Sequence, residues 1–268
     1  MAYSKLEVKN PGPEDQVFKD RINVDRVIIR MEGRYEMEQE SEGFCRFCHK
    51  TFSGAGMGRH LSTCKTRKEK NAFEPGKGGK QYKIYHLKIF GSKWYWLHIE
   101  IPANATLSDI DEFLRAIWLE CCGHLSAFDI KGVRYEVQTY HDDFASWSRP
   151  PESMNKRLYT VLNVKDTFSY EYDFGSTTYI DGQVMAVRDG SLGKDRLRIM
   201  ARNNTYTFEC EDCGKKASVL CTECDGYLCD ACLGAHGCGE EMVMPVVNSP
   251  RMGVCGYVGP DTVDDWAP

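Results

Sequence analysis

The segment that decides the fold is residues 82–118, YKIYHLKIFGSKWYWLHIEIPANATLSDIDEFLRAIW. Two runs of aromatic and β-branched residues flank Gly91 and Ser92, an arrangement typical of two strands joined by a short hairpin. Thr106 and Asp109 follow with the spacing of a capping box, which marks the first turn of a helix. The segment therefore predicts a β-hairpin followed by an amphipathic helix.

The predicted helix carries its apolar residues on one face, and Gly123 stands where a helix commonly ends in a left-handed glycine. Strand-like runs continue afterwards, for example VRYEVQTY at 133–140 and TFSYEYDF at 167–174. One helix and many strands predict an α+β domain over residues 82–208, with a mainly antiparallel sheet and one principal helix. The apolar helix face comprises Leu107, Ile110, Phe113, Leu114, Ile117, Trp118 and Cys121.

The first cysteine cluster is Cys45-x-x-Cys48, followed after eleven residues by His60-x-x-x-Cys64. A Cys pair in a tight turn and a His and a Cys four apart on a helix offer four ligands in the geometry that zinc prefers. Residues 44–70 therefore predict a zinc finger, which resembles the Cys-Cys-His-Cys variants of the ββα finger. The alternative is a zinc clip that only folds a segment too small for its own core.

A second cluster holds three Cys-x-x-Cys pairs and one His-x-Cys pair within residues 209–268. Eight ligands suffice for two tetrahedral zinc ions, so we expect three zinc ions in all. The stretch resembles a B-box, and this resemblance implies a cross-brace in which alternate pairs share an ion. Because His236 and Cys238 are one residue apart, Cys255 is an alternative eighth ligand. The expected sets are Cys210, Cys213, Cys229 and Cys232 for one ion, and Cys221, Cys224, His236 and Cys238 for the other.

Residues 82–188 resemble the plasmid pRi ORF-three-like family, through the hairpin and helix quoted above and FSYEYDFGSTTYIDGQV at 168–184. The Y-D-F-G turn of that family is present at 172–175. Residues 176–180 lack the acidic, Trp and His positions that many relatives carry. The resemblance implies an α+β fold and no established activity. If those polar positions form a site in the family, this chain lacks it.

Other cysteines and histidines of the middle segment predict structural roles. Cys121 and Cys122 end a core-facing helix, where buried cysteines are expected. His124 follows the helix end, where it is expected to cap carbonyl groups. His86 and His98 lie in strands with alternating neighbours and are expected to face solvent or a sheet edge. A pair facing each other across the hairpin is the alternative.

Charge is distributed unevenly along the chain, whose net charge is −5. Residues 44–83 carry +8 and residues 209–241 carry −6. This asymmetry favours a polyanion such as DNA or RNA as partner of the basic end and a protein as partner of the acidic end. A merely solvated basic surface is the alternative. The candidate nucleic-acid contacts are Arg59, Lys65, Arg67, Lys68 and Lys70.

Composition excludes some classes of protein. Of the 268 residues, 42% are hydrophobic and 27% charged, which predicts a folded chain. Neither a membrane-spanning apolar run nor a secretory signal is visible, so we expect a cytoplasmic protein that makes no membrane contact and whose cysteines bind metal.

The segments fall into an N-terminal extension (1–43), the finger, a Pro- and Gly-containing linker (71–81), the middle domain and the C-terminal zinc module with its tail. No convincing nucleophile, base or phosphate loop stands out, and no catalytic or cofactor-binding residue is predicted beyond the zinc ligands. We therefore expect a non-enzymatic zinc protein that binds or bridges partners. One alternative is an enzyme acting on a nucleotide or nucleic-acid substrate, with a cleft around Tyr172–Thr178. A second alternative is that both zinc modules are purely structural and only stabilise the fold.

Overall fold

The computed structural model describes residues 41–73, 81–91, 94–137 and 150–260. Most of the predicted N-terminal extension, and residues 74–80 of the predicted linker, lie outside this description.

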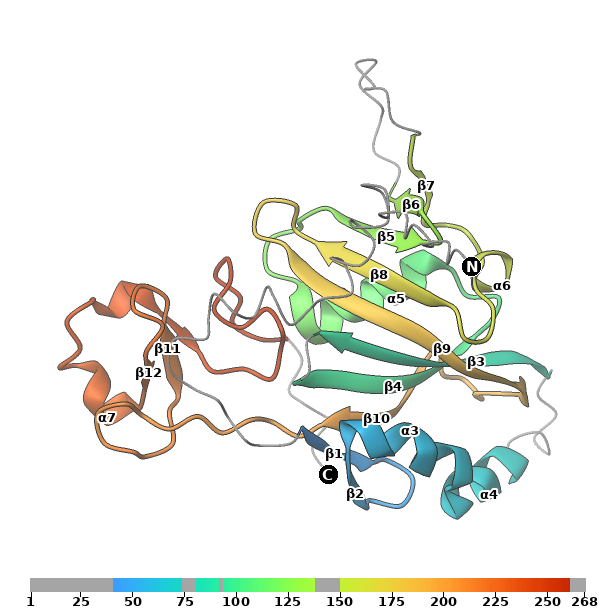
Figure 1. Cartoon of the computed structure of the whole chain (residues 1–268), viewed down its shortest axis with the longest axis horizontal. Coiled ribbons are helices and arrows are strands. Elements are labelled where there is room, and N and C mark those ends of the chain that lie inside the picture. The colour runs from blue at the N-terminus through green and yellow to red at the C-terminus, as the bar shows by residue number, and fades with distance from the viewer. Residues whose placement is uncertain (1–40, 74–80, 92–93, 138–149, 261–268) are drawn as a thin grey trace, which may run out of the picture. The chain divides into compact units, whose positions relative to one another are not determined.

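One large sheet forms the centre of the fold, with ten strands in the order β2-β1-β10-β4-β3-β9-β8-β5-β6-β7 (Figure 1). Neighbouring strands are antiparallel except for β6 and β7, which are parallel. The predicted α+β class with a mainly antiparallel sheet is confirmed. The strands are β1 (Glu42–Cys45), β2 (Thr51–Ser53), β3 (Tyr82–Gly91), β4 (Tyr95–Pro102), β5 (Ser126–Ile130), β6 (Val133–Glu136), β7 (Glu152–Ser153), β8 (Thr167–Tyr172), β9 (Thr178–Gly190) and β10 (Arg198–Asn203).

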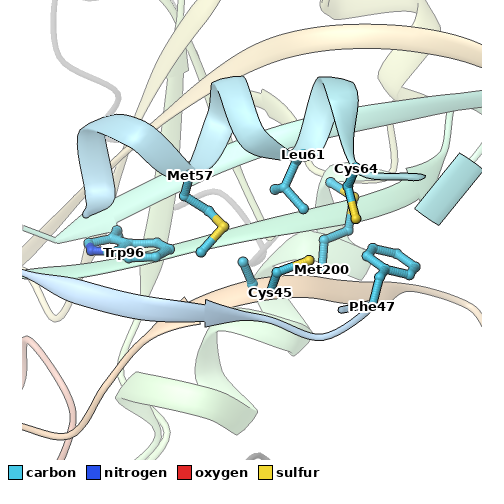
Figure 2. Close-up of a cluster of buried hydrophobic side chains, with 8 residues drawn as sticks. Cys45, Phe47, Met57, Leu61, Cys64, Trp96 and Met200 are labelled. Atoms are coloured by element: carbon cyan, nitrogen blue, oxygen red, sulfur yellow. The ribbon is translucent and has the colours of Figure 1, made fainter. Parts of the chain in front are cut away.

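Strand β4 is buried along both of its faces, from Tyr95 to Ile101. Because side chains alternate along a strand, Trp96, His98 and Glu100 point to one face and the intervening aliphatic residues to the other. The helices α3 (Gly54–Thr63) and α4 (Lys65–Phe73) cover the face of Trp96. The helix α5 (Leu107–Leu114) lies on the other side of the sheet (Figures 1 and 2).

Helix α5 begins with the predicted capping box. The Asp109 backbone N–H donates to Thr106 Oγ1 at 3.2 Å, and the Thr106 backbone N–H donates to Asp109 Oδ2 at 2.7 Å. The chain then makes a π-helical turn, η2 (Arg115–Leu119), and becomes extended at Glu120. The helical part therefore stops before Cys121, which the sequence pattern had placed on the buried helix face.

We expect Thr106→Ala to destabilise the fold by about 1 kcal/mol, because it removes the oxygen that caps the Asp109 N–H. Thermal or urea unfolding measures the effect. Thr160→Ala is the control, since this exposed hydroxyl donates only to the Arg157 carbonyl at the short helix α6 (Leu158–Val161). Equal destabilisation by both substitutions would contradict the capping role.

The finger shares the central sheet. Strand β1 pairs with β10, with Phe44 opposite Arg202, and β2 pairs with β1 at the edge. The sequence pattern treated residues 44–70 as a module preceding a separate domain, whereas the backbone hydrogen bonds join the two into one sheet.

Residues 209–245 form a second, small sheet of three strands in the order β12-β11-β13. Strand β11 (Val219–Cys221) pairs antiparallel with both β12 (Tyr227–Leu228) and β13 (Val243–Pro245). Two short helices, α7 (Asp230–Leu233) and the 3-10 turn η3 (Glu240–Met242), complete this C-terminal module.

Candidate metal centres

The finger brings its four predicted ligands together. Cys45 comes from β1, Cys48 from the following turn, His60 from α3 and Cys64 from the end of α3, and their ligand atoms lie within 4.8 Å of one another. Cys48 Sγ lies 3.3 Å from His60 Nε2. The Phe52 ring stacks on the His60 ring with 3.9 Å between centroids, which fixes the orientation of the imidazole.

The core beneath the finger is shared with the sheet (Figure 2). Met57 and Leu61 point down from α3 and are fully buried. They pack in one cluster with Trp96 of β4 and Met200 of β10. The finger therefore has more apolar support than its own short sequence provides.

The C-terminal module forms the cross-brace implied by the B-box resemblance. One group joins the first and third Cys pairs and the other joins the second Cys pair with His236 and Cys238, each within 4.8 Å. Cys213 Sγ lies 3.6 Å from Cys229 Sγ in the first group, and Cys224 Sγ lies 3.5 Å from His236 Nε2 in the second. Of the two alternatives for the last ligand, the structure places Cys238 in this group and Cys255 elsewhere.

Three Cys-x-x-Cys turns share one backbone conformation. In each, the N–H of the first cysteine donates to the carbonyl five residues later, at 3.0 Å for Cys45, 2.6 Å for Cys210 and 2.8 Å for Cys221. The residue after the second cysteine has a positive φ in all three: His49 at 56°, Gly214 at 69° and Asp225 at 59°. The shared turn aims both sulfurs at one point, as a tetrahedral ion requires.

Thiol acidity differs between the centres. Burial opposes ionisation of Cys210, but backbone N–H groups that donate to its sulfur outweigh burial and lower its pKa to about 6. The same balance, aided by His236, lowers the pKa of Cys221 to about 7. Burial raises the pKa of Cys45 to about 12.

The structure also assembles a fourth group that the sequence reasoning missed: Cys121, Cys122, His124 and Cys255. Two of the expectations for these residues were wrong. Cys122 is exposed and Cys121 half-buried, because the helix ends before them. His124 points its Nε2 atom at the sulfurs of Cys122 and Cys255 and does not cap the helix. The Cys-Cys-x-His spacing at 121–124 is a local signal for three of these ligands. The fourth, Cys255, lies 131 residues after His124 and has no such signal.

The basic candidates divide into two kinds. Arg59, Lys65, Lys68 and Lys70 are exposed on α3 and α4. Arg67 instead turns inward, where it donates to the Leu61 carbonyl at 2.9 Å and to Glu100 Oε1 at 2.8 Å. Its side chain is only 11% exposed and pairs with Glu100, so Arg67 does not belong to the exposed basic surface.

His86 and His98 do not face solvent, contrary to expectation. Both are buried, and His86 Nε2 lies 2.8 Å from His98 Nδ1, which is the alternative arrangement of a facing pair. Burial lowers the pKa of His86 to about 3, and that of His98 falls well below its usual value. Both rings are therefore neutral at pH 7 and serve as a hydrogen-bonded layer under the finger.

The turn at Tyr172–Thr178, where the enzyme alternative placed a cleft, gathers its polar groups around Arg251. This fully buried guanidinium donates to Asp173 Oδ2 at 2.7 Å and to Thr178 Oγ1 at 3.0 Å. It also lies over the Tyr172 ring, 4.8 Å from its centroid. These groups hold the C-terminal segment onto the sheet.

Residues 87–215 match the family model described as Plasmid pRiA4b ORF-3-like protein, which supports the family resemblance of the middle of the chain. A comparison with curated proteins finds no match. Among solved structures, a protein of unknown function from Methanosarcina mazei Go1 is similar at 21% identity and a TM-score of 0.39, over 50% of this chain and 75% of that chain.

Within the described residues, no helix is both long enough and apolar enough to cross a bilayer.

Proposed function

We propose that the chain is a non-enzymatic zinc protein that binds nucleic acid through α3 and α4 and a protein through its C-terminal module. The three predicted Cys/His groups support zinc as the metal, because sulfur and imidazole donors in sets of four match its tetrahedral preference. Four protein ligands leave no open position at such an ion, which suits a structural role better than catalysis.

The observation that carries the nucleic-acid half is the exposed basic surface of the two finger helices. Arg59, Lys65, Lys68 and Lys70 present four positive charges to solvent, and Glu69 is the one carboxylate interspersed with them. With Arg67 neutralised by Glu100, the surface still carries a clear positive excess. Such a surface attracts phosphates by releasing their counterions.

The same helix argues against base-specific readout. In ββα fingers, bases are read from the position before the helix and from its third and sixth residues. Here these positions are Ser53, whose hydroxyl caps the helix by accepting from the Gly56 N–H, then Gly56 itself, and Arg59. Only Arg59 has a side chain that can reach a base. We therefore infer affinity for the phosphate backbone with little sequence preference.

The charge reversal Lys65→Glu/Lys68→Glu should weaken binding of a labelled duplex or single strand at least tenfold at low salt. The dependence of log affinity on log salt should also become shallower by about two, because two phosphate contacts are lost. Fluorescence polarisation over a salt series measures both quantities.

The matched control is Lys215→Glu/Lys216→Glu, which changes the net charge equally on two exposed lysines of the C-terminal module. It should leave most of the affinity intact. Absence of binding at low salt, or an equal loss in both variants, would remove nucleic acid from the proposal.

The protein-binding half is supported by the acidity of the C-terminal module. Its exposed carboxylates outnumber its two exposed lysines, which favours a partner with a basic surface and repels phosphate. These carboxylates belong to Glu209, Glu211, Asp212, Glu223, Asp225, Asp230 and Glu241.

A further inference from the structure

We propose that Cys121, Cys122, His124 and Cys255 form a fourth zinc site, which fastens the C-terminal segment to the end of η2. The inference goes beyond the proposed function, because it concerns neither partner surface and adds an ion to the three expected.

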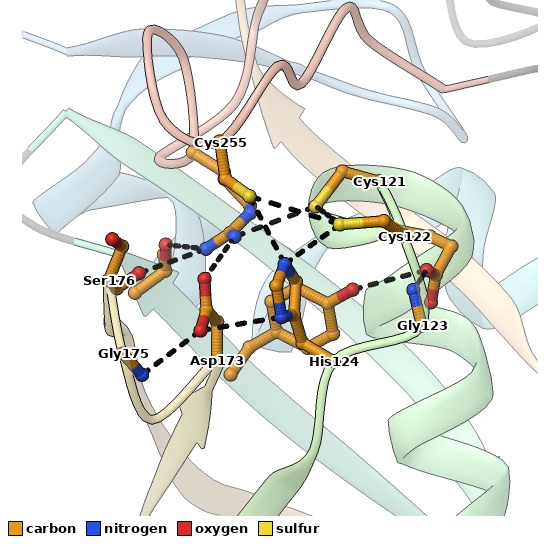
Figure 3. Close-up of polar contacts among 12 residues, drawn as sticks. Cys121, Cys122, Gly123, His124, Asp173, Gly175, Ser176 and Cys255 are labelled. Carbon is orange, nitrogen blue, oxygen red and sulfur yellow. Dashed lines mark hydrogen bonds and ion pairs between the residues drawn. The ribbon is translucent and has the colours of Figure 1, made fainter.

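The sulfur–sulfur separations fit a single tetrahedral ion, and the sulfur–nitrogen separations are a few tenths of an ångström shorter than such an ion requires (Figure 3). With Zn–S near 2.3 Å and Zn–N near 2.0 Å, ligand atoms should lie about 3.8 Å apart for two sulfurs and about 3.5 Å apart for sulfur and nitrogen. The Cys121 and Cys122 sulfurs are 3.6 Å apart, and those of Cys122 and Cys255 are 3.8 Å apart. His124 Nε2 lies 2.9 Å from Cys122 Sγ and 3.2 Å from Cys255 Sγ.

The imidazole of His124 is held in the orientation that a metal ligand needs. Its Nδ1 atom lies 3.4 Å from Asp173 Oδ1, which leaves Nε2 aimed at the three sulfurs. A carboxylate behind the second nitrogen fixes the tautomer and raises the basicity of a ligating histidine. Asp173 is itself held by the buried Arg251, so the support extends through three residues.

The charges around the group also fit a bound ion. Three thiolates exceed the charge of one Zn²⁺ by one negative unit. Arg251 approaches from the buried side, with Nη2 3.5 Å from Cys121 Sγ. This guanidinium has no solvent exposure and also pairs with Asp173, so it places one positive charge beside both the sulfurs and the carboxylate that orients His124.

The inventory of cysteines points the same way. All thirteen cysteines of the chain are free of disulfides, and every one belongs to one of the four groups. Among the described residues, the fourth group differs from the others in joining the middle of the chain to Cys255, 133 positions after Cys122. Its ion therefore closes a long loop and anchors the segment that follows the C-terminal module.

The test is the zinc content of the purified full-length protein by elemental analysis. We expect four zinc ions per chain in the wild type, and three after Cys255→Ser or Cys122→Ser. The double variant should also hold three, because both cysteines serve one ion. The matched control is Val258→Ser, which changes an exposed side chain of the same segment and should keep four.

Cobalt titration of the wild type gives a second readout that needs no variant. Thiolate-to-cobalt absorption should rise until four equivalents are bound. Saturation at three equivalents, an unchanged zinc count in Cys255→Ser, or a Cys122–Cys255 disulfide in the zinc-loaded protein would each overturn the fourth site. A wild-type protein that holds three zinc ions and still binds nucleic acid would contradict the fourth site but leave the proposed function intact. A protein that holds four zinc ions and does not bind nucleic acid would contradict only the proposed nucleic-acid binding.

Discussion

Removal of zinc should unfold the C-terminal module while the central sheet stays folded. The cluster of buried residues in this module consists of Cys210, Leu228 and Cys229, with Val219, Cys232 and Leu233 packed against it. Half of these residues are candidate metal ligands. Such a core buries too little apolar surface to offset the conformational entropy of ordering 209–245 without an ion.

Hydrogen exchange measured with and without a strong chelator tests this expectation. Amides of β11 and β12 should lose their protection almost completely, whereas those of β3 and β4 should keep theirs. The finger provides an internal comparison, because Trp96, Met200 and Ala201 of the sheet contribute to its core and should preserve part of its order. Full protection of β11 in the metal-free protein would contradict the structural role of these ions.

Replacing Glu100 with Gln should destabilise the protein by about 3–5 kcal/mol, the range found when one partner of a buried ion pair is removed. Glu100 has no solvent exposure and sits among three guanidinium groups. Arg67 donates to Oε1 at 2.8 Å, Arg188 donates to both oxygens, and Arg198 lies 3.6 Å from Oε2. The amide would remove the negative charge to which both Arg67 and Arg188 donate.

The effect of this substitution should depend on pH. Burial alone would raise the pKa of Glu100, but the hydrogen bonds from Arg188 and Arg67 outweigh it and lower the pKa to about 2. A carboxylate whose pKa is lower in the folded than in the unfolded state stabilises the fold above the unfolded pKa, near 4.3. That contribution is lost as the pH falls from there towards 2.

Urea unfolding of wild type and Glu100→Gln at several pH values measures the gap between them. The difference in unfolding free energy between the two proteins should be largest near pH 7 and should decrease below about pH 4. Glu152→Gln is the control, because its ion pair with Lys156 is solvent-exposed and contributes little to stability. A gap below 1 kcal/mol at pH 7 would show that the arginines find other partners.

Features set by local spacing could be predicted from the sequence. The Cys-x-x-Cys turns, the His60–Cys64 pair and the capping box at Thr106 depend on residues within a few positions of one another. The hairpin of β3 and β4 is equally local, and the antiparallel class follows from it. The family resemblance was identified from residues 82–188, which include this hairpin and the capped helix.

Features set by tertiary contact could not be predicted in this way. No local pattern shows that β1 adds to β10 or that Arg67 turns inward to Glu100. The hairpin offers the contact between His86 and His98 only as an alternative, because the helices that bury this face are not visible in the local pattern. The fourth metal group depends on where η2 ends and on the return of Cys255 to that point. Periodicity extended the helix past Leu119, so Cys121 looked like a core residue.

The pairing of β1 with β10 has a consequence for any shortened form of this protein. A chain that starts at the middle domain would leave the outer side of β10 unpaired at Ala201–Asn203, with bare amide and carbonyl groups along it. Such an edge is a template for strand addition from another molecule, and proteins normally shield it to stay monomeric. In the full chain the finger covers this edge of β10, and the sheet ends instead at the three-residue strand β2.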